Sequence, residues 1–194
     1  MTSEGHILFS IASLIVAYKL QLTFEIVHGD WIYMLLGASI GSLLPDIDHK
    51  SSLFGRIFFF ISFFMSKIFS HRGFTHSLLS WIILIVFFYI FHIEKLISND
   101  LIQAFLLGYI SHHFADMLTP YGVSFLWPLS YRFSIPIIVG KNNKRRERCI
   151  SIILIGCYYI FYFKDHFDVV FYFNKIINFF KILNILEWSN KKYF

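Results

Sequence analysis

Four short polar motifs in this mostly apolar chain contain side chains that could bind a metal ion. They read "EGH" at 4–6, "LLPDIDH" at 43–49, "HRGFTHS" at 71–77 and "GYISHHFAD" at 108–116. Imidazoles and carboxylates are ordinary ligands of Zn²⁺ and similar divalent ions. Such groups are costly beside apolar segments unless each has a partner, access to water or a function. The candidate ligands are His6, Asp46, Asp48, His71, His76, His112 and Asp116.

The fourth motif has the strongest local spacing. His112 and Asp116 are four residues apart, so a helix would present them on one face, whereas His113 would point away. A histidine and a carboxylate placed in this way can bind one ion together. They can equally form a structural hydrogen bond with each other, so both interpretations stay open.

The second motif places Asp46 and Asp48 directly after Pro45. We expect a helix to stop there and extended backbone to point both carboxylates the same way, toward a hard divalent cation. The alternative is a solvated turn in which the aspartates bond to nearby backbone.

The third motif combines two histidines with Arg72 and Thr75. We expect Thr75 to cap the following helix, which places His76 in its first turn and keeps that imidazole neutral. His71 can approach the same point only if the segment is a loop. Arg72 suits a phosphate or a carboxylate, and its alternative role is to reach toward lipid headgroups.

The composition favours a membrane protein. Hydrophobic residues make up 57% and charged residues 15% of the chain, whereas soluble domains carry about 25% charged residues. Five of the basic residues that give the net charge of +5 lie in "KNNKRRER" at 141–148, beside an apolar run. This placement is typical of a cytoplasmic loop flanking a membrane segment and argues against a nucleic-acid partner. Cys149 and Cys157 form no metal-binding or disulfide pattern.

Apolar periodicity predicts an all-α, multi-pass membrane protein, a bundle of about four to six helices with its His/Asp cluster at one membrane face. Residues 77–91 carry no charge, which suits a crossing of roughly 30 Å of hydrocarbon, and 54–69 suits the interface plane. We expect one domain over 1–194: a motif-bearing region at 1–140, the basic loop at 141–148, and hydrophobic and amphipathic helices at 149–194. The expected helices are 6–22, 31–44, 54–69, 76–96, 101–118 and 149–163, with an amphipathic tail at 167–188.

Counting membrane crossings from the basic loop brings all four motifs to one membrane face. If residues 141–148 are cytoplasmic, the end of 101–118, the start of 76–96, the 45–75 connection and residue 6 are cytoplasmic too. The motifs would then meet at a cytoplasmic site able to hold one or two metal ions.

The motifs "EGHILFS", "LLPDIDH", "HRGFTHS" and "GYISHHFADMLTPYGVSFLWPL", in this order over about residues 1–140, resemble the YdjM-type family of bacterial inner-membrane proteins. That family is described as LexA-regulated, membrane-bound, metal-dependent hydrolases, with a more remote similarity to zinc-dependent phospholipase C and P1-type nucleases. The resemblance implies an all-helical protein of the bacterial inner membrane, with Zn²⁺ as the first choice of metal before Mn²⁺, Fe²⁺ or Mg²⁺.

The motifs and the resemblance together predict a hydrolase that acts on a phosphoester such as a phospholipid headgroup, with the lipid bilayer as its partner. A metal ion would activate water, and Arg72 and Asp48 are the catalytic candidates. Two other classes fit the same residues: a non-catalytic membrane protein with a structural or regulatory metal site, and a small transporter.

Overall fold

The computed structural model describes residues 1–69, 72–138, 145–153 and 155–156, and this part of the chain is helical. Its one extended pairing is an isolated antiparallel bridge between Val123 and Phe133, so the all-α prediction is confirmed for these residues. Two compact units divide the chain, Met1–Ile155 and Gly156–Phe194. The predicted tail at 167–188 and the end of the predicted helix 149–163 lie outside the described residues, and the single-domain division stays a prediction.

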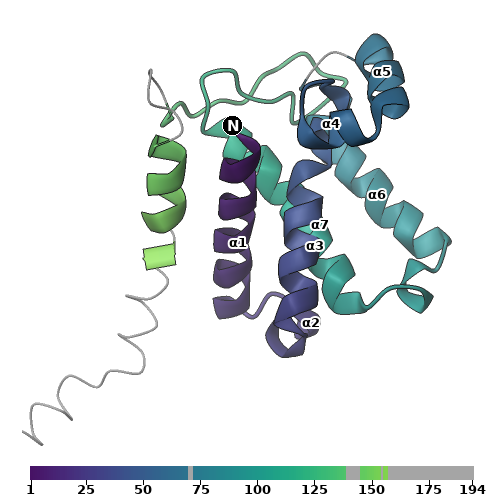
Figure 1. Cartoon of the computed structure of the whole chain (residues 1–194), viewed down its shortest axis with the longest axis vertical. Helices are drawn as coiled ribbons and strands as arrows, with labels where there is room; N and C mark the ends of the chain where they lie inside the picture. The colour runs from purple at the N-terminus through teal and green to yellow at the C-terminus, as the bar shows by residue number, and fades with distance from the viewer. Residues whose placement is uncertain (70–71, 139–144, 154, 157–194) are drawn as a thin grey trace, which may run out of the picture. The chain divides into compact units, whose positions relative to one another are not determined.

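Within the first unit, short 3-10 turns (η) interrupt the series of α-helices at three places among the described residues (Figure 1). Residues 145–153 are also helical. The elements are α1 (Ser3–Lys19), α2 (Phe24–His28), α3 (Trp31–Leu43), η1 (Pro45–Asp48), α4 (Leu53–Ile57), α5 (Phe59–Ile68), η2 (Phe74–His76), α6 (Leu78–Ile90), η3 (Ile93–Lys95) and α7 (Asn99–Met117).

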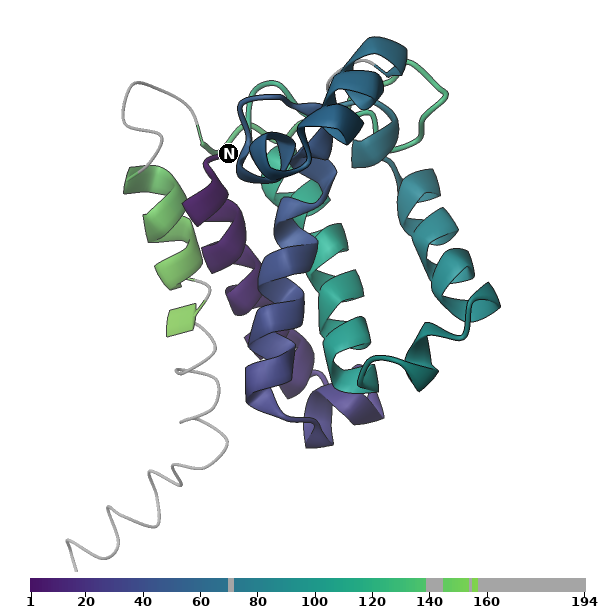
Figure 2. The same cartoon turned by 45° about the vertical axis from the view of Figure 1, so that its right-hand side comes forward.

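Helices α1, α3 and α7 pack side by side and form the core, which the turned view in Figure 2 shows clearly. Their shared interior contains Leu14 and Met34, both fully buried, together with small alanines that let the helices approach closely. Burial of a side chain as large as leucine or methionine stabilises the fold by about 1.5–3 kcal/mol. The core cluster consists of Leu14, Ala17, Ile26, Met34, Ala38 and Ala104.

The contact between α3 and α7 is a backbone-to-backbone contact made possible by glycine. Gly37 and Gly41 lie one turn apart on α3, and Gly108 lies on α7. A Cβ at Gly41 would collide with the carbonyl of Phe105, and one at Gly108 with the carbonyl of Ala38. Small residues at four-residue spacing allow this approach. The absence of side chains at these glycines therefore allows the short distance between α3 and α7.

The predicted helix 54–69 is wrong as one element, because the chain bends at Phe58 between α4 and α5. Both short helices pack against η1, and a straight helix could not keep both contacts. The predicted helix 76–96 is also too long. It ends at Ile90, and His92 then adopts a left-handed conformation with φ of 49°.

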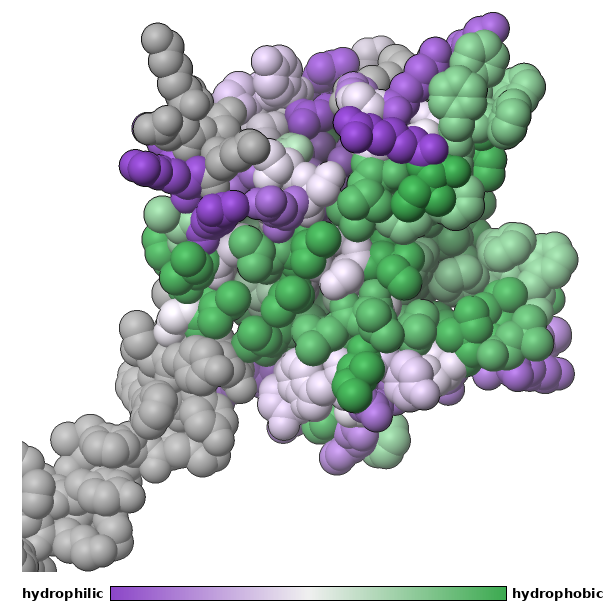
Figure 3. Space-filling model, in the orientation of Figure 1, coloured by the Kyte–Doolittle hydropathy of each residue, from purple (hydrophilic) through white to green (hydrophobic). Residues whose placement is uncertain are grey.

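Much of the apolar surface faces outward. Phe60, Tyr89 and Leu96 are each nearly four-fifths exposed, and Figure 3 shows a hydrophobic band across the helices between hydrophilic residues at the two ends. The helix α6 has 13 residues and so extends over about 20 Å, which is less than the roughly 30 Å predicted for its crossing. Among the described residues, we find no helix with both the length and the apolar character needed to traverse a bilayer.

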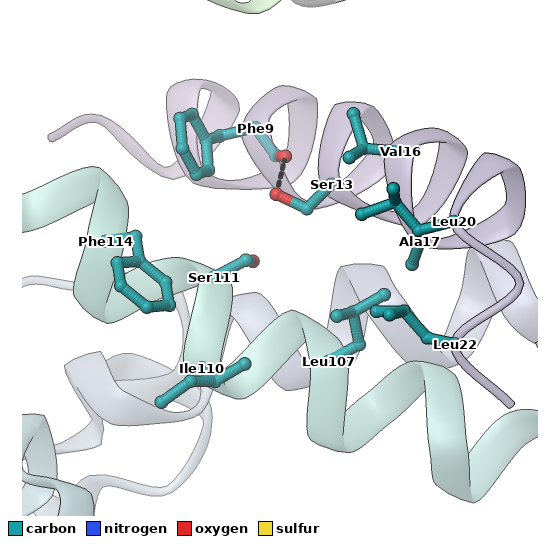
Figure 4. A pocket seen from close by; sticks show the side chains of 10 residues that line it. All are labelled: Phe9, Ser13, Val16, Ala17, Leu20, Leu22, Leu107, Ile110, Ser111 and Phe114. Carbon is teal, nitrogen blue, oxygen red and sulfur yellow. Dashed lines mark hydrogen bonds between the residues drawn. The ribbon is translucent and has the colours of Figure 1, made fainter.

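A hollow of about 290 Å³ lies between α1 and α7, and its wall is apolar (Figure 4). Two serines contribute to the wall, but their hydroxyls bond within their own helices. Ser13 donates to the carbonyl of Phe9, and Ser111 donates to the carbonyl of Gly108. The hollow therefore offers little hydrogen bonding to a ligand.

Replacement of Gly41 by alanine should destabilise the protein by about 1–3 kcal/mol, because the new methyl group must push α3 away from α7. Denaturation of the detergent-purified protein measures this change. The control is Gly156→Ala, since a Cβ there meets no atom of the described residues within 4 Å. Equal stability of the Gly41 and Gly156 variants would show that the backbone contact is not tight.

Candidate metal centre

The described polar residues of the four motifs converge at one end of the helical core. His6 lies near the start of α1, Asp46 in η1 after α3, and His76 in η2 before α6. His112 and Asp116 occupy the end of α7. In Figure 1 this end lies beside the N label, where these helices start or stop. Segments up to 110 residues apart in the sequence thus supply one cluster.

Two overlapping groups of side chains have the geometry of a metal site. His6, Asp46 and His112 form one group, and His76, His112 and Asp116 form the other. In each group the potential ligand atoms all lie within 4.8 Å of one another. His112 belongs to both groups, so the arrangement could hold one ion or two neighbouring ions.

His112 is oriented by the backbone of α3. Its Nδ1 lies 2.6 Å from the carbonyl oxygen of Ser42, and because a carbonyl only accepts, Nδ1 carries the proton. The lone pair of Nε2 therefore faces the cluster, 3.1 Å from Nε2 of His76. A metal-binding histidine usually has this kind of partner for its other nitrogen. The glycine contact of α3 and α7 brings the Ser42 carbonyl within reach.

The carboxylates of the cluster favour a positive charge on His76. Burial disfavours the charged imidazolium of His76, but the carboxylates of Asp46, Asp48 and Asp116 outweigh burial and raise the pKa of His76 above its ordinary value. Burial likewise opposes ionisation of Asp46, yet His112 and His76 hold the pKa of this carboxyl well below its usual range. Nε2 of His76 lies 3.5 Å from Asp46 Oδ1 and 3.7 Å from Asp116 Oδ2. A proton on His76 therefore occupies a place suited to a cation.

Buried polar atoms without hydrogen bonds support the same conclusion. Both ring nitrogens of His6 and the Oδ2 of Asp116 are buried and have no hydrogen-bond partner among the described residues. His6 stacks on His112 with the ring centroids 3.7 Å apart, and its Nε2 lies 3.5 Å from Asp116 Oδ1. Buried polar groups are nearly always satisfied, so these atoms call for an additional partner. The residues present therefore fit a bound divalent ion.

Asp48 differs from Asp46, which corrects the expectation that extended backbone points both carboxylates the same way. Residues Pro45–Asp48 form a 3-10 turn, and Asp48 belongs to neither group of potential ligands. Its Oδ2 accepts hydrogen bonds from the Thr75 hydroxyl and the Arg72 backbone N–H, 3.0 and 3.1 Å away, and lies 3.7 Å from His76 Nδ1. Asp48 thus lies beside the Nδ1 atom of His76, on the side of the ring opposite the other potential ligands, and helps to orient this imidazole.

The capping expectation for Thr75 is wrong as well. Ser77 caps α6 by accepting a hydrogen bond from the Ser80 N–H, while His76 ends the preceding η2 turn. Thr75 instead lies inside the η2 turn, and its hydroxyl donates to Asp48. Tyr109 completes the support of this turn by donating to the Thr75 carbonyl at 2.8 Å.

Arg72 positions Asp116 in this structure. Its guanidinium donates to Asp116 Oδ1 at 3.2 Å, to the Thr119 hydroxyl at 3.1 Å and to the Gly122 carbonyl at 3.4 Å. The Arg72 backbone has φ of 62°, a left-handed conformation that costs about 1–3 kcal/mol outside glycine. The hydrogen bond from the Arg72 N–H to Asp48 helps to hold that conformation. The predicted role of Arg72 toward a substrate phosphate stays a prediction.

A polar cavity of about 290 Å³ adjoins the cluster. Asp46 and Arg72 form part of its wall, so a small polar molecule in the cavity would contact the candidate ligands directly. The remaining wall is hydrophilic apart from Met1, whose amine lies 2.8 Å from Asp116 Oδ1. The lining residues are Met1, Ser3, Asp46, His49, Ser51, Ser52 and Arg72.

The sequence placed most of the cluster and missed its supports. His71 lies outside the described residues, so its role as a ligand stays a prediction. The carbonyl of Ser42 carries no side-chain signal, and Thr119 lies just after α7, outside the four polar motifs. Glu147 belongs to the basic segment 141–148, yet it is buried and accepts hydrogen bonds from both the backbone N–H and the hydroxyl of Thr2.

Fold and site together define a small helical protein with buried histidines and aspartates converging at one end. The chain belongs to the YdjM inner membrane protein family, whose model matches residues 1–168. This confirms the resemblance drawn from the four motifs and the localisation at the inner membrane.

Individual relatives agree with this membership. The chain is 45% identical over 155 residues to inner membrane protein YdjM of Escherichia coli (strain K12), which covers 79% of each chain. The same values apply to inner membrane protein YdjM of Shigella flexneri. Identity to the uncharacterized protein YvsG of Bacillus subtilis (strain 168) is 32% over 163 residues, or 83% of this chain and 95% of that protein. No solved structure matches the chain significantly.

Elemental analysis of the detergent-purified protein should find Zn, Mn or Fe near one ion or more per chain. Replacing His112 by alanine or Asp116 by asparagine should lower that content strongly, because each removes a potential ligand. His92→Ala is the control, since His92 is exposed on η3. A folded protein free of metal, or unchanged content in both site variants, would contradict the assignment.

Replacement of Arg72 by lysine should weaken metal affinity by roughly 10–100-fold, because an ammonium cannot make all three contacts of the guanidinium. The backbone cost at this position is the same for both residues, so the comparison isolates the side chain. Competition with a chromogenic chelator measures the affinity. Equal affinities would mean that Asp116 keeps its orientation unaided.

Proposed function

We propose that this protein is a membrane-bound, metal-dependent hydrolase that acts on a phosphoester, with a phospholipid headgroup as its substrate class. The observation that carries the proposal is the convergence of His6, Asp46, His76, His112 and Asp116 beside a polar cavity. His/Asp sites of this kind bind divalent ions that activate water for hydrolysis.

The cavity favours a catalytic ion over a structural one. Structural zinc sites are closed by four protein ligands, whereas catalytic sites keep a position open for water or substrate. Here His76, His112 and Asp116 are buried, while the Asp46 side chain is partly exposed and lines the cavity. A substrate phosphate could therefore approach from the Asp46 side.

The chain's own residues have distinct roles in this proposal. A bound divalent ion would supply a hydroxide near neutral pH and polarise the phosphoryl oxygen. His112 keeps its Nε2 lone pair toward the cluster because Ser42 holds the Nδ1 proton. Arg72 fixes Asp116 and also lines the cavity, where its positive charge favours an anionic substrate.

The hydrophobic surface supports a lipid as the substrate. The hydrophobic band seen in Figure 3 lies next to the hydrophilic end that carries the cluster. A protein of the inner membrane with this arrangement would place the cavity near the level of lipid headgroups. A transporter would instead need its polar residues along a path through the molecule, whereas here they gather at helix ends.

The purified protein should hydrolyse at least one of three substrates: a chromogenic phosphodiester, a phosphomonoester or a phospholipid in mixed micelles. EDTA should abolish the activity and added Zn²⁺ or Mn²⁺ should restore it. His76→Ala should lower the rate by at least roughly 100-fold, since the ion's charge is worth several kcal/mol in the transition state. His92→Ala should leave it unchanged.

A preparation that holds metal stoichiometrically but turns over none of the three substrates would contradict the proposed hydrolase activity. It would support the non-catalytic metal site instead.

A further inference from the structure

Helices α4 and α5 carry an unusual concentration of exposed apolar side chains next to the candidate metal centre. Phe60 is 79% exposed and Ile68 is 69% exposed. The same segment packs on η1, which carries Asp46. We call the exposed face the α5 surface, and it consists of Ile57, Phe59, Phe60, Ile61, Phe64 and Ile68.

Two lysines border this surface and meet at one aromatic ring. The ammonium of Lys50 lies 4.7 Å from the ring centroid of Phe63, and that of Lys67 lies 4.3 Å from the same centroid. Each contact is attractive because the ring face is electron-rich. Both positive charges therefore lie against the same ring at the border of the α5 surface.

The stretch of sequence that carries these lysines has no acidic residue. From His49 to Ile93 there is no Asp or Glu, whereas Arg56 and Arg72 add to the charge of the two lysines. The nearest preceding carboxylate, Asp48, is buried and accepts hydrogen bonds from Arg72 and Thr75. An anion beside Lys50 and Lys67 would therefore offset positive charge that no carboxylate in this stretch of sequence offsets.

There is also room for an anion at this place. A cavity of about 310 Å³ lies between the loop after η1 and α5, and its wall consists of Asp48, His49, Lys50, Ser51 and Ser66, the residue before Lys67. Figure 3 shows hydrophilic side chains directly beside hydrophobic ones at the end of the molecule where α4 and α5 lie. A ligand that fits has a negative head and an apolar body.

We propose that the α5 surface binds an anionic phospholipid, with its phosphate beside Lys50 and Lys67 and its acyl chains along Phe60 and Phe64. This site adjoins the candidate metal centre, with which its cavity shares His49 and Ser51, and it does not depend on catalysis. Apolar faces bordered by lysines bind anionic membrane surfaces in this way. The inner-membrane family of the chain supplies the setting.

The charge of the surface argues for lipid over a second copy of the chain. In a symmetric dimer the same patch lies on both sides of the contact, so the lysines of one copy would approach those of the other. That juxtaposition is repulsive, whereas the phosphate of a lipid is attracted to both lysines.

The test compares two lipids that differ only in their headgroup. Full-length protein in a neutral detergent is titrated with phosphatidylglycerol or with phosphatidylcholine of the same acyl chains, and the thermal unfolding midpoint is followed. Wild-type protein should be stabilised more by phosphatidylglycerol. The double variant Lys50→Gln/Lys67→Gln should bind phosphatidylglycerol roughly tenfold more weakly or worse.

The matched control is Lys19→Gln/Lys95→Gln, which removes the same charge from the ends of α1 and η3 and should respond like wild type. Phe60→Gln should weaken binding of both lipids, because it removes apolar contact alone. Equal responses of wild type to the two lipids would overturn the proposal, as would an unchanged Lys50/Lys67 variant. So would a shift of the same size produced by inorganic phosphate, or self-association of wild type that Phe60→Gln abolishes.

Discussion

The candidate site depends on one hydrogen bond, from Nδ1 of His112 to the carbonyl of Ser42. This bond selects the tautomer of a residue that belongs to both groups of potential ligands. It can form only because α3 and α7 touch through their backbones at Gly41 and Gly108. Packing and chemistry are therefore coupled: the residues that set the helix spacing also decide which nitrogen faces the cluster.

Around this bond, the polar end of the molecule is built in two layers. His6, Asp46, His76, His112 and Asp116 form the two overlapping groups of potential ligands. Behind them, side chains that belong to neither group hold these residues in place. Asp48 and Thr75 fix the turn that carries His76, and Arg72 fixes Asp116 against the loop after α7. Outer partners of this kind orient metal ligands and tune their basicity.

Local sequence signals predicted what depends on local structure. The i, i+4 spacing of His112 and Asp116 correctly placed both on one helical face, and the apolar periodicity gave α1, α3 and α7 within a few residues. The predictions that failed are those that depend on tertiary contacts. Phe58 bends the chain because α4 and α5 both pack on η1, and Asp48 turns inward because Thr75 and the Arg72 backbone lie there. Neither cause can be read from neighbouring residues.

The stacking of His6 on His112 has a consequence for the range of ions that the cluster could accept. The stack fixes the plane of the His6 ring, but a half-turn about the Cβ–Cγ bond leaves that plane unchanged and exchanges Nδ1 with Cδ2 and Nε2 with Cε1. Neither nitrogen loses a hydrogen bond to a described residue by this rotation. His6 can thus offer a donor nitrogen in either orientation of its ring, and so adjust its reach to cations of different radius.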